Sequence, residues 1–439
     1  MNLSRITKNP LFIGTILLTA SGVLSRIIGF FYRIFLSHTI GAEGVGIYQL
    51  IFPVYILCFA LTSAGIQSAI SKYVAEASVS KNNISGKCYM VAGFLLSFSL
   101  SILCAFYLHN HADFLATRIV HESRTAPLFR ILAYAIPCCS IHNCIMGYYY
   151  GIKKAAIPSV AQLLEQIVRV LSVYVIYRIQ LQDGIEISPS IAVWGVVCGE
   201  ASSSLFTMAA IRISKFPLNS LFSACKKIFC LSLPMTGNRV VLSLFTSMEA
   251  ILIPLKLQES GLSSSQALSL FGILTGMVLP LILFPSSITN SLAVMLLPTV
   301  SEASAAGKEE KIRTAVSKSI TYCMLFGFFC TVFFFVTGSF LGNFLFHTDL
   351  CGEYIRQLSF ICPFMYLAST LVSILNGLGK TLQTFCYNLI GISIRLLFAV
   401  FAIPLLGTKG YLWGLLASEI ILCTCLVWAL KSYLPKNKG

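Results

Sequence analysis

Residues 25–33 read SRIIGFFYR and lie inside an apolar run that extends from Leu11 to Leu36. A run of this length can cross a bilayer as a helix, because about 20 apolar residues span the hydrocarbon core. Arg26 and Arg33 interrupt it. An arginine at the centre of a spanning helix costs roughly 2.5 to 3.5 kcal/mol on insertion scales. We therefore expect this helix to turn its charges toward a cavity or a partner and away from lipid.

The composition extends this interpretation to the whole chain. Of its 439 residues, 56% are hydrophobic and 11% are charged, and the mean hydropathy is +0.83. Apolar side chains in this proportion cannot all be buried in one aqueous core. No polar stretch is long enough to form a soluble domain. The sequence predicts an all-α polytopic membrane protein.

Twelve apolar runs are long enough to be transmembrane helices. They cover residues 11–36, 47–70, 88–108, 128–149, 157–179, 190–211, 228–255, 268–292, 317–341, 354–378, 381–405 and 411–432. If alternate loops lie on opposite sides, 19 of the 31 Lys and Arg residues fall on one side and 7 on the other, with five inside spans. The excess marks the cytoplasmic side, so both termini are expected in the cytoplasm. This topology explains the net charge of +15 without a nucleic-acid partner.

The two halves of the chain resemble each other. WGVVCGE at 194–200 recurs as WGLLASE at 413–419, and SRII at 25–28 recurs as NRVV at 238–241. At a constant offset, further pairs are Pro137 with Pro363, Gly151 with Gly377, Lys154 with Lys380, Arg169 with Arg395, and AEAS at 75–78 with SEAS at 301–304. The expected architecture is two six-helix repeats, 1–211 and 228–439, joined by a basic cytoplasmic linker at 212–227.

The repeat pairs the arginines inside the spans. Arg26 matches Arg239, which follows Asn238, and Arg169 matches Arg395, whereas Arg33 has no equivalent and lies nearer the outer interface. We expect these residues to line a cavity between the halves, where guanidinium groups bind phosphate or pyrophosphate. The alternative is structural pairing with buried carboxylates.

Four glutamates are the carboxylates expected at membrane depth: Glu165, Glu200, Glu249 and Glu419. A site that couples transport to H⁺ or Na⁺ would need one of them. Glu165 and Arg169 lie four residues apart and therefore share one helical face, which favours an ion pair. The spacing of His111, His121 and His142 indicates no metal site, and no nucleophile or phosphate-loop motif indicates an enzyme. We expect no cofactor and no metal.

Two segments resemble a known family. They read SGVLSRIIGFFYRIFLSHTIGAEGVGIYQLIFPVYILCFALTSAGIQSAISKYVAEAS at 21–78 and LLPTVSEASAAGK at 296–308. The chain resembles the polysaccharide-transporter branch of the MOP flippase superfamily, of the stage V sporulation protein B type. The resemblance implies two six-helix lobes around a central cavity that opens alternately to each side. It is also similar to the lipid II flippases, whose first-helix arginine matches Arg26, but the arginines of their second and eighth helices have no counterpart.

We therefore predict a flippase of the bacterial cytoplasmic membrane that moves a lipid-linked oligosaccharide or peptidoglycan precursor by alternating access. Its partners would be a polyprenyl-(pyro)phosphate-linked saccharide and membrane lipids, and an H⁺ or Na⁺ gradient or the membrane potential would drive it. One alternative is a multidrug or organic-cation antiporter of the same superfamily, which would use the glutamates. Another is a non-transporting scaffold that recruits envelope-synthesis enzymes through its basic loops.

Overall fold

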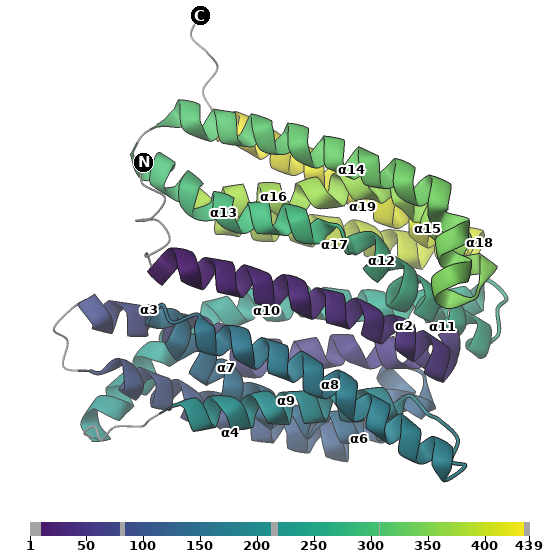
Figure 1. The fold of residues 1–439 in the computed structure, drawn as a ribbon, viewed down its shortest axis with the longest axis horizontal. Helices are drawn as coiled ribbons and strands as arrows, with labels where there is room; N and C mark the ends of the chain where they lie inside the picture. Colours follow the sequence, from purple (N-terminus) through teal and green to yellow (C-terminus); the bar gives the residue numbers. More distant parts are fainter. Residues whose placement is uncertain (1–9, 80–83, 212–217, 307, 434–439) are drawn as a thin grey trace, which may run out of the picture. The chain divides into compact units, whose positions relative to one another are not determined.

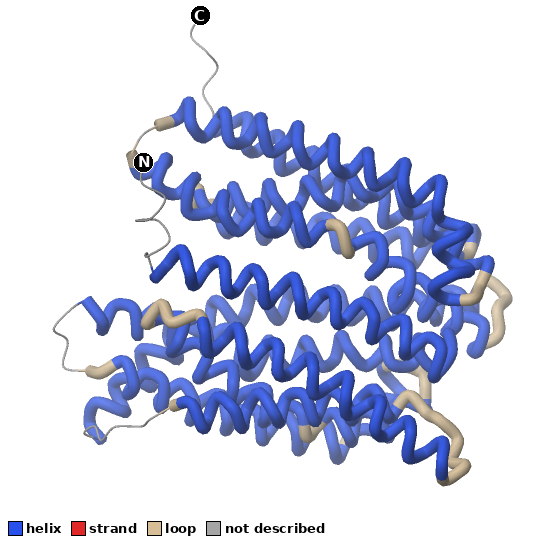
Figure 2. Tube along the Cα trace, in the orientation of Figure 1, coloured by secondary structure: helices blue, strands red, loops and turns tan. Residues whose placement is uncertain are grey.

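The computed structural model describes residues 10–79, 84–211, 218–306 and 308–433. Every regular element in these ranges is helical, as Figure 2 shows. The chain divides into two compact units. Unit 1 holds Met1–Ile40 and Ile47–Ser247, and unit 2 holds Gly41–Gly46 and Met248–Gly439. The predicted all-α class is confirmed.

Unit 1 is built around the adjacent helices α7 and α9 (Figure 1). Helices α3 and α4 pack on α7, while α8 packs along α9. The helical segments are α2 (Pro10–Phe59), η1 (Ala60–Ala64), α3 (Gly65–Val79), α4 (Gly86–Asn110), α5 (Ala112–Phe114), η2 (Leu115–Ile119), η3 (Ser123–Thr125), α6 (Ala126–Leu132), α7 (Ala135–Gly151), α8 (Ala156–Gln182), α9 (Ser190–Ala210) and most of α10 (Leu218–Glu259). A buried apolar cluster that includes Ile70, Tyr89 and Ile145 joins α3, α4 and α7.

Unit 2 repeats this packing scheme. Helices α13 and α14 pack on α16, α16 packs on α19, and α17 packs along α19. The segments are α11 (Ser264–Gly272), η4 (Ile273–Val278), α12 (Leu279–Leu283), α13 (Ser286–Ala305), α14 (Glu309–Phe346), α15 (Asp349–Leu358), η5 (Ser359–Ile361), α16 (Cys362–Gly377), α17 (Thr381–Phe401), α18 (Ile403–Leu406) and α19 (Thr408–Tyr433). The sequence matches fall on equivalent helices, because AEAS ends α3 where SEAS ends α13, and Pro137 begins α7 where Pro363 begins α16. The predicted repeat is thus visible in the packing.

Ten helices of the described residues are long and apolar enough to cross a membrane, or eleven if the bent pair Ser123–Leu132 and Ala135–Gly151 forms one span. One of these ten helices contains both of the predicted spans 11–36 and 47–70. The two spans lie on either side of Gly41, whose φ of 69° is not helical. The count of twelve remains a prediction. So does the central cavity.

Two segments differ from their predicted form. The span expected at 268–292 is not one continuous α-helix, because it passes through the π-helical segment η4 and is interrupted at Phe284 and Pro285, after which α13 continues to Ala305. A proline at the start of a helix lacks the N–H that would continue the preceding helix. Residues 218–227 of the expected linker belong to α10, and 212–217 lie outside the described residues.

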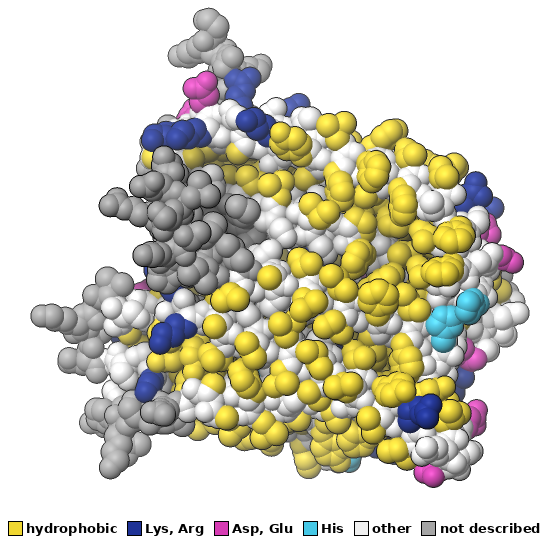
Figure 3. Space-filling model, viewed as in Figure 1, with side chains coloured by type: hydrophobic (Ala, Val, Ile, Leu, Met, Phe, Trp, Pro, Cys, Tyr) yellow, Lys and Arg dark blue, Asp and Glu magenta, His cyan; other side chains and the backbone are white. Residues whose placement is uncertain are grey.

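Large apolar side chains are exposed over the surface (Figure 3). On α14 alone they include Phe328, Phe329, Val336, Phe340 and Phe344, each at least 64% exposed. Contiguous exposed apolar surface on this scale is unfavourable in water and favourable in hydrocarbon. Because all regular backbone hydrogen bonds here are satisfied within helices, the fold meets the main requirement of the bilayer interior. The chain is a multi-pass membrane protein.

Candidate functional site: two buried ion clusters

The first cluster lies in unit 1 and centres on Arg169 of α8. Arg169 Nη2 lies 2.5 Å from Glu165 Oε1, one turn earlier on the same helix, and 3.9 Å from Glu200 Oε1 on α9. The Glu200 side chain is only 6% exposed, whereas that of Glu165 is 20% exposed. The ion pair predicted from the four-residue spacing is confirmed. One guanidinium group therefore interacts with two carboxylates.

Two glycines of α9 place this arginine against its neighbour helix. A Cβ atom added at Gly199 would lie 2.8 Å from the carbonyl oxygen of Glu165 and 3.2 Å from Cβ of Arg169. A Cβ atom at Gly195 would lie 3.1 Å from the carbonyl oxygen of Arg169. The missing side chains let α8 and α9 approach closely, as small residues do between membrane helices. This close approach brings Arg169 within reach of Glu200.

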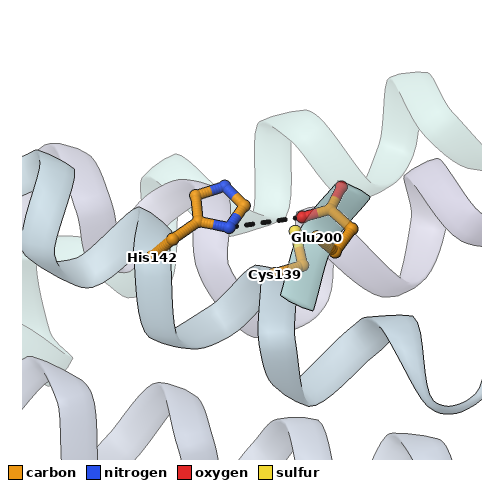
Figure 4. A group of neighbouring side chains, drawn as sticks. All are labelled: Cys139, His142 and Glu200. Atoms are coloured by element: carbon orange, nitrogen blue, oxygen red, sulfur yellow. Dashed lines mark ion pairs between the residues drawn. The ribbon is translucent and has the colours of Figure 1, made fainter. Parts of the chain in front are cut away.

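Glu200 has two further neighbours that sequence reasoning missed. The hydroxyl of Tyr55 on α2 donates to Glu200 Oε1 at 2.6 Å. His142 on α7 presents Nδ1 to Glu200 Oε2 at 3.3 Å, as Figure 4 shows. Both His142 and Glu200 are buried. The only sequence signal for this contact was the polar pair His142 and Asn143 within an otherwise apolar run.

Asn143 determines the protonation of His142. Its Nδ2 lies 2.8 Å from the carbonyl oxygen of Cys139 and 3.0 Å from His142 Nε2. A carbonyl oxygen can only accept, so this atom is the amide nitrogen, and its second hydrogen can be donated to Nε2 or to Cys139 Sγ at 3.3 Å. With Nε2 as the acceptor, the imidazole is neutral and carries its hydrogen on Nδ1. Nδ1 lies 3.3 Å from Glu200 Oε2 without forming a hydrogen bond.

The same region raises the question of a metal site. Donor atoms of Cys139, His142 and Glu200 lie within 4.8 Å of one another, an association between α7 and α9 that spacing along the chain did not reveal (Figure 4). A metal on His142 Nδ1 would require the hydrogen on Nε2, where it would face the Asn143 N–H. Arg169 would add a positive charge beside the ion. The residues as arranged fit a hydrogen-bonded cluster and not a metal centre.

The second cluster lies in unit 2 and centres on Arg395 of α17. Arg395 Nε lies 2.9 and 3.1 Å from the two carboxylate oxygens of Glu249 on α10, and Nη1 lies 3.5 Å from Glu419 Oε1 on α19. The side chains of Glu249 and Glu419 are 9% and 7% exposed. Buried charges require such pairing, because an isolated one is very costly. This cluster ties three helices together.

The two clusters share a core that the repeat predicted. Arg169 and Arg395 are repeat partners, Glu200 and Glu419 are repeat partners, and each arginine faces its glutamate from the neighbouring helix. The remaining glutamates differ, because Glu165 lies on the helix of its arginine and Glu249 on another helix. All four glutamates expected at membrane depth are thus ion-paired.

The other predicted substrate residues lie outside these clusters. Arg26 on α2, and Asn238 and Arg239 on α10, are exposed. Arg33, which we expected nearest the outer interface, lies within electrostatic range of Arg169, Tyr32 and Tyr48. No carboxylate of the described residues forms an ion pair with it. The buried hydroxyl of Tyr32 lies near that of Tyr48.

These features define a class of protein: a multi-pass helical membrane protein made of two repeated units, with ionic side chains inside its spans, as in secondary transporters. A family model described as "Polysaccharide biosynthesis protein" matches residues 11–304. The chain belongs to this family.

Individual relatives agree with this class. The chain is 27% identical to stage V sporulation protein B of Bacillus subtilis, over 98% of this chain and 85% of the relative. Its fold is similar to that of an inward-facing multidrug resistance MATE family transporter of the MOP superfamily (TM-score 0.76, 14% identity, 96% of this chain and 99% of the other). It is also similar to that of the lipid II flippase MurJ in an inward closed conformation (TM-score 0.73, 16% identity, 95% and 87%). The resemblance predicted from the sequence is confirmed, and these relatives are transporters or sporulation proteins by name, not enzymes.

Proposed function

We propose that the chain is a flippase that moves a polyprenyl-(pyro)phosphate-linked saccharide, such as an oligosaccharide or a peptidoglycan precursor, across the bacterial cytoplasmic membrane. Its two units would alternate in exposing the substrate to either side, with both termini in the cytoplasm. Membership of the polysaccharide biosynthesis family supports the saccharide. The similarity to lipid II flippases and stage V sporulation protein B supports the lipid carrier and the bacterial membrane.

One observation carries the proposal: unit 1 holds a cation within its spans that no carboxylate neutralises. Arg33 lies within electrostatic range of Arg169 and forms no ion pair among the described residues, and the buried hydroxyl of Tyr32 lies within the same range. A guanidinium group and a hydroxyl are the donors that a phosphate or pyrophosphate accepts. Arg26 and Arg239, which also lack ion pairs in the described chain, supply further guanidinium groups. Arg169 and Arg395 are paired with glutamates of their own units and are therefore less available to bind phosphate.

The test is translocation in liposomes. Protein reconstituted with a fluorescent undecaprenyl-pyrophosphate-linked saccharide should move it between leaflets. Arg33→Gln should lower the rate about 10- to 100-fold, because a hydrogen bond to a charged group contributes roughly 1.5–3 kcal/mol. Arg178→Gln removes an exposed arginine of α8 in the same unit and serves as the matched control. No movement of any polyprenyl-linked substrate, or equal loss in both variants, would sink the proposal.

We further infer that an H⁺ or Na⁺ gradient or the membrane potential drives the cycle. Each cluster holds two glutamates and one arginine, so at least one carboxylate per cluster can take up a cation. The measurement is the same assay with imposed gradients of H⁺, Na⁺ or potential, one at a time. A rate that ignores all three gradients would contradict this part of the proposal.

A second candidate is an organic-cation antiporter, which the same excess of carboxylates favours. It would bind its substrate through Glu249 and Glu419. Uptake of a fluorescent organic cation into these liposomes, lost in Glu249→Gln and kept in Arg33→Gln, would favour the antiporter over the flippase. A scaffold that recruits envelope-synthesis enzymes would show neither activity and would depend on 308–318 and 212–227.

A further inference from the structure

We propose that Glu165 is a proton-binding site and that its protonation transfers Arg169 from Glu165 to Glu200. The proton comes from water and binds one carboxylate oxygen of Glu165. No covalent bond of the protein other than this O–H changes. The role of this step in transport rests on the proposed flippase function, whereas the proton site itself does not.

Of the two carboxylates near Arg169, Glu200 has the surroundings that favour the ionised form. Its Oε1 accepts a hydrogen bond from the Tyr55 hydroxyl at 2.6 Å. His142 Nδ1 lies 3.3 Å from its Oε2 without forming a hydrogen bond. Arg169 adds a positive charge 3.9 Å from the first oxygen. Hydrogen bonds and charges of this kind favour the ionised carboxylate.

Glu165 has no hydroxyl donor among the described residues and accepts only from Arg169 Nη2. Arg169 is its ion-pair partner, and its side chain is more exposed than that of Glu200. The other titratable groups that face it are Glu200 on α9 and His142 on α7. His142 is held neutral, so the nearest charge besides Arg169 is a second carboxylate. Where two carboxylates share one arginine, we expect the proton to bind the carboxylate that has fewer hydrogen-bond donors around it.

The remaining surroundings of Glu200 do not alter this assignment. From α7, Cys138 and Cys139 also face Glu200, and both are thiols without a formal charge. Helix α6 also packs on α9, and its Arg130 is engaged by Asp113 in an exposed ion pair. Arg33 of α2 lies within electrostatic range of Arg169 and adds a positive charge to this region.

Arg169 has a second position available. Its Nε and the Glu200 Oε2 are both buried, and neither has a hydrogen-bond partner among the described residues. Gly199 lies next to this Nε, since a Cβ atom there would be 3.5 Å away. Loss of charge on Glu165 weakens its ion pair, and a shift of Arg169 toward Glu200 would satisfy unpaired donors and acceptors. A buried polar group without a partner is costly. We therefore expect Arg169 to be paired either with Glu165 or with Glu200, and not to lie between them.

The switch links proton binding to anion binding. With Glu165 ionised, Arg169 faces two carboxylates, and this ion cluster carries one negative charge. With Glu165 protonated, Arg169 faces only Glu200, and the cluster is neutral beside the unpaired Arg33. An anionic phosphate head group then binds more tightly, and by reciprocity its binding favours the proton.

Infrared spectroscopy tests the proton site without any transport. The purified chain in lipid nanodiscs, titrated from neutral to acidic pH, should show the C=O band of a buried protonated carboxyl group. Glu165→Gln should lower the intensity of this band by the contribution of one carboxyl group, and Glu249→Gln, the matched variant in unit 2, should keep that contribution because Arg395 Nε holds both Glu249 oxygens. A band of undiminished intensity in Glu165→Gln, or one that diminishes only in Glu200→Gln, would overturn the proposal. Circular dichroism and thermal unfolding verify that each variant is folded.

Liposomes then separate the two proposals. The wild-type protein should translocate its lipid-linked saccharide faster when an inward or outward pH gradient is imposed, and Glu165→Gln should lose this pH response. If the infrared titration follows Glu165 but no saccharide moves, only the flippase function fails. If the saccharide moves and Glu165→Gln retains the pH response, the coupling inference fails while the flippase function stands.

Discussion

The two buried clusters share an arginine and a glutamate at equivalent positions of the repeat but differ in geometry. In unit 1, Arg169 binds closely to Glu165 at 2.5 Å and only distantly to Glu200 at 3.9 Å, and Tyr55 and His142 support the second glutamate. In unit 2, Arg395 holds both of its glutamates at once, with distances of 2.9 to 3.5 Å. The first arrangement leaves Arg169 an alternative partner, whereas the second leaves Arg395 none. The arginine of unit 1 can therefore change its carboxylate partner, whereas the equivalent arginine of unit 2 cannot.

The largest difference should appear when each arginine is removed. Arg395→Gln leaves Glu249 and Glu419 buried without a cation, which costs about 3–5 kcal/mol by the rule for broken buried pairs. Arg169→Gln should cost less, about 1–3 kcal/mol, because Glu165 can take up a proton and Glu200 keeps its Tyr55 hydrogen bond. Thermal unfolding of both variants in the same detergent measures the difference. Equal losses, or a greater loss in Arg169→Gln, would show that the clusters do not differ in this way.

The helix contact beside each cluster offers a second comparison. In the repeat, Gly199 of α9 corresponds to Ser418 of α19, which is buried. Gly199→Ser places a Cβ atom 2.8 Å from the Glu165 carbonyl oxygen, and overpacking of this kind costs roughly 1–3 kcal/mol. The reverse change, Ser418→Gly, should cost less than about 1 kcal/mol, mainly from backbone entropy. Unfolding temperatures that fall equally in both variants would contradict the close approach of α8 and α9.

The smallest effect concerns the support of Glu200. Tyr55→Phe removes one hydrogen-bond donor and should cost about 1 kcal/mol or slightly more, since the acceptor is a carboxylate. It should also let Glu200 take up a proton, so that Tyr55→Phe combined with Glu165→Gln regains the lost intensity of the infrared carboxyl band. In unit 2, Tyr411 of α19 is buried within electrostatic range of Glu249 and Arg395, and no hydrogen bond joins it to a glutamate among those of the described residues, so Tyr411→Phe is the control. A double variant without this regained intensity would mean that Tyr55 does not keep Glu200 ionised.

Local pattern predicted part of the site. The helical spacing of Glu165 and Arg169 was enough to predict their ion pair, because residues four apart share a helical face. The repeat correctly paired Arg169 with Arg395 and Glu200 with Glu419. Contacts between distant segments were not predictable in this way. Tyr55 meets Glu200 across 145 residues of chain, and Arg395 meets Glu249 across 146.

The eighth predicted span shows a similar limit for the fold. Apolar content at 268–292 indicated one helix, and the structure has a π-helical segment and a break at Pro285. Hydropathy measures how well a segment tolerates lipid, but it does not report whether its backbone is continuous. The proline was visible in the sequence, and only the packed helices show that the helix breaks there.

The sequence by itself determined that this protein is an all-helical membrane protein with two related halves and ionic groups at membrane depth. Hydrophobic length and repetition are properties of the chain, and the bilayer permits few other solutions. The tertiary structure decided which ions meet and which donors Glu200 receives. Those contacts depend on the rotation and close approach of helices, which Gly195 and Gly199 set for α8 and α9. At distances of 2.5 to 3.9 Å, shifts of one ångström decide which carboxylate holds the arginine.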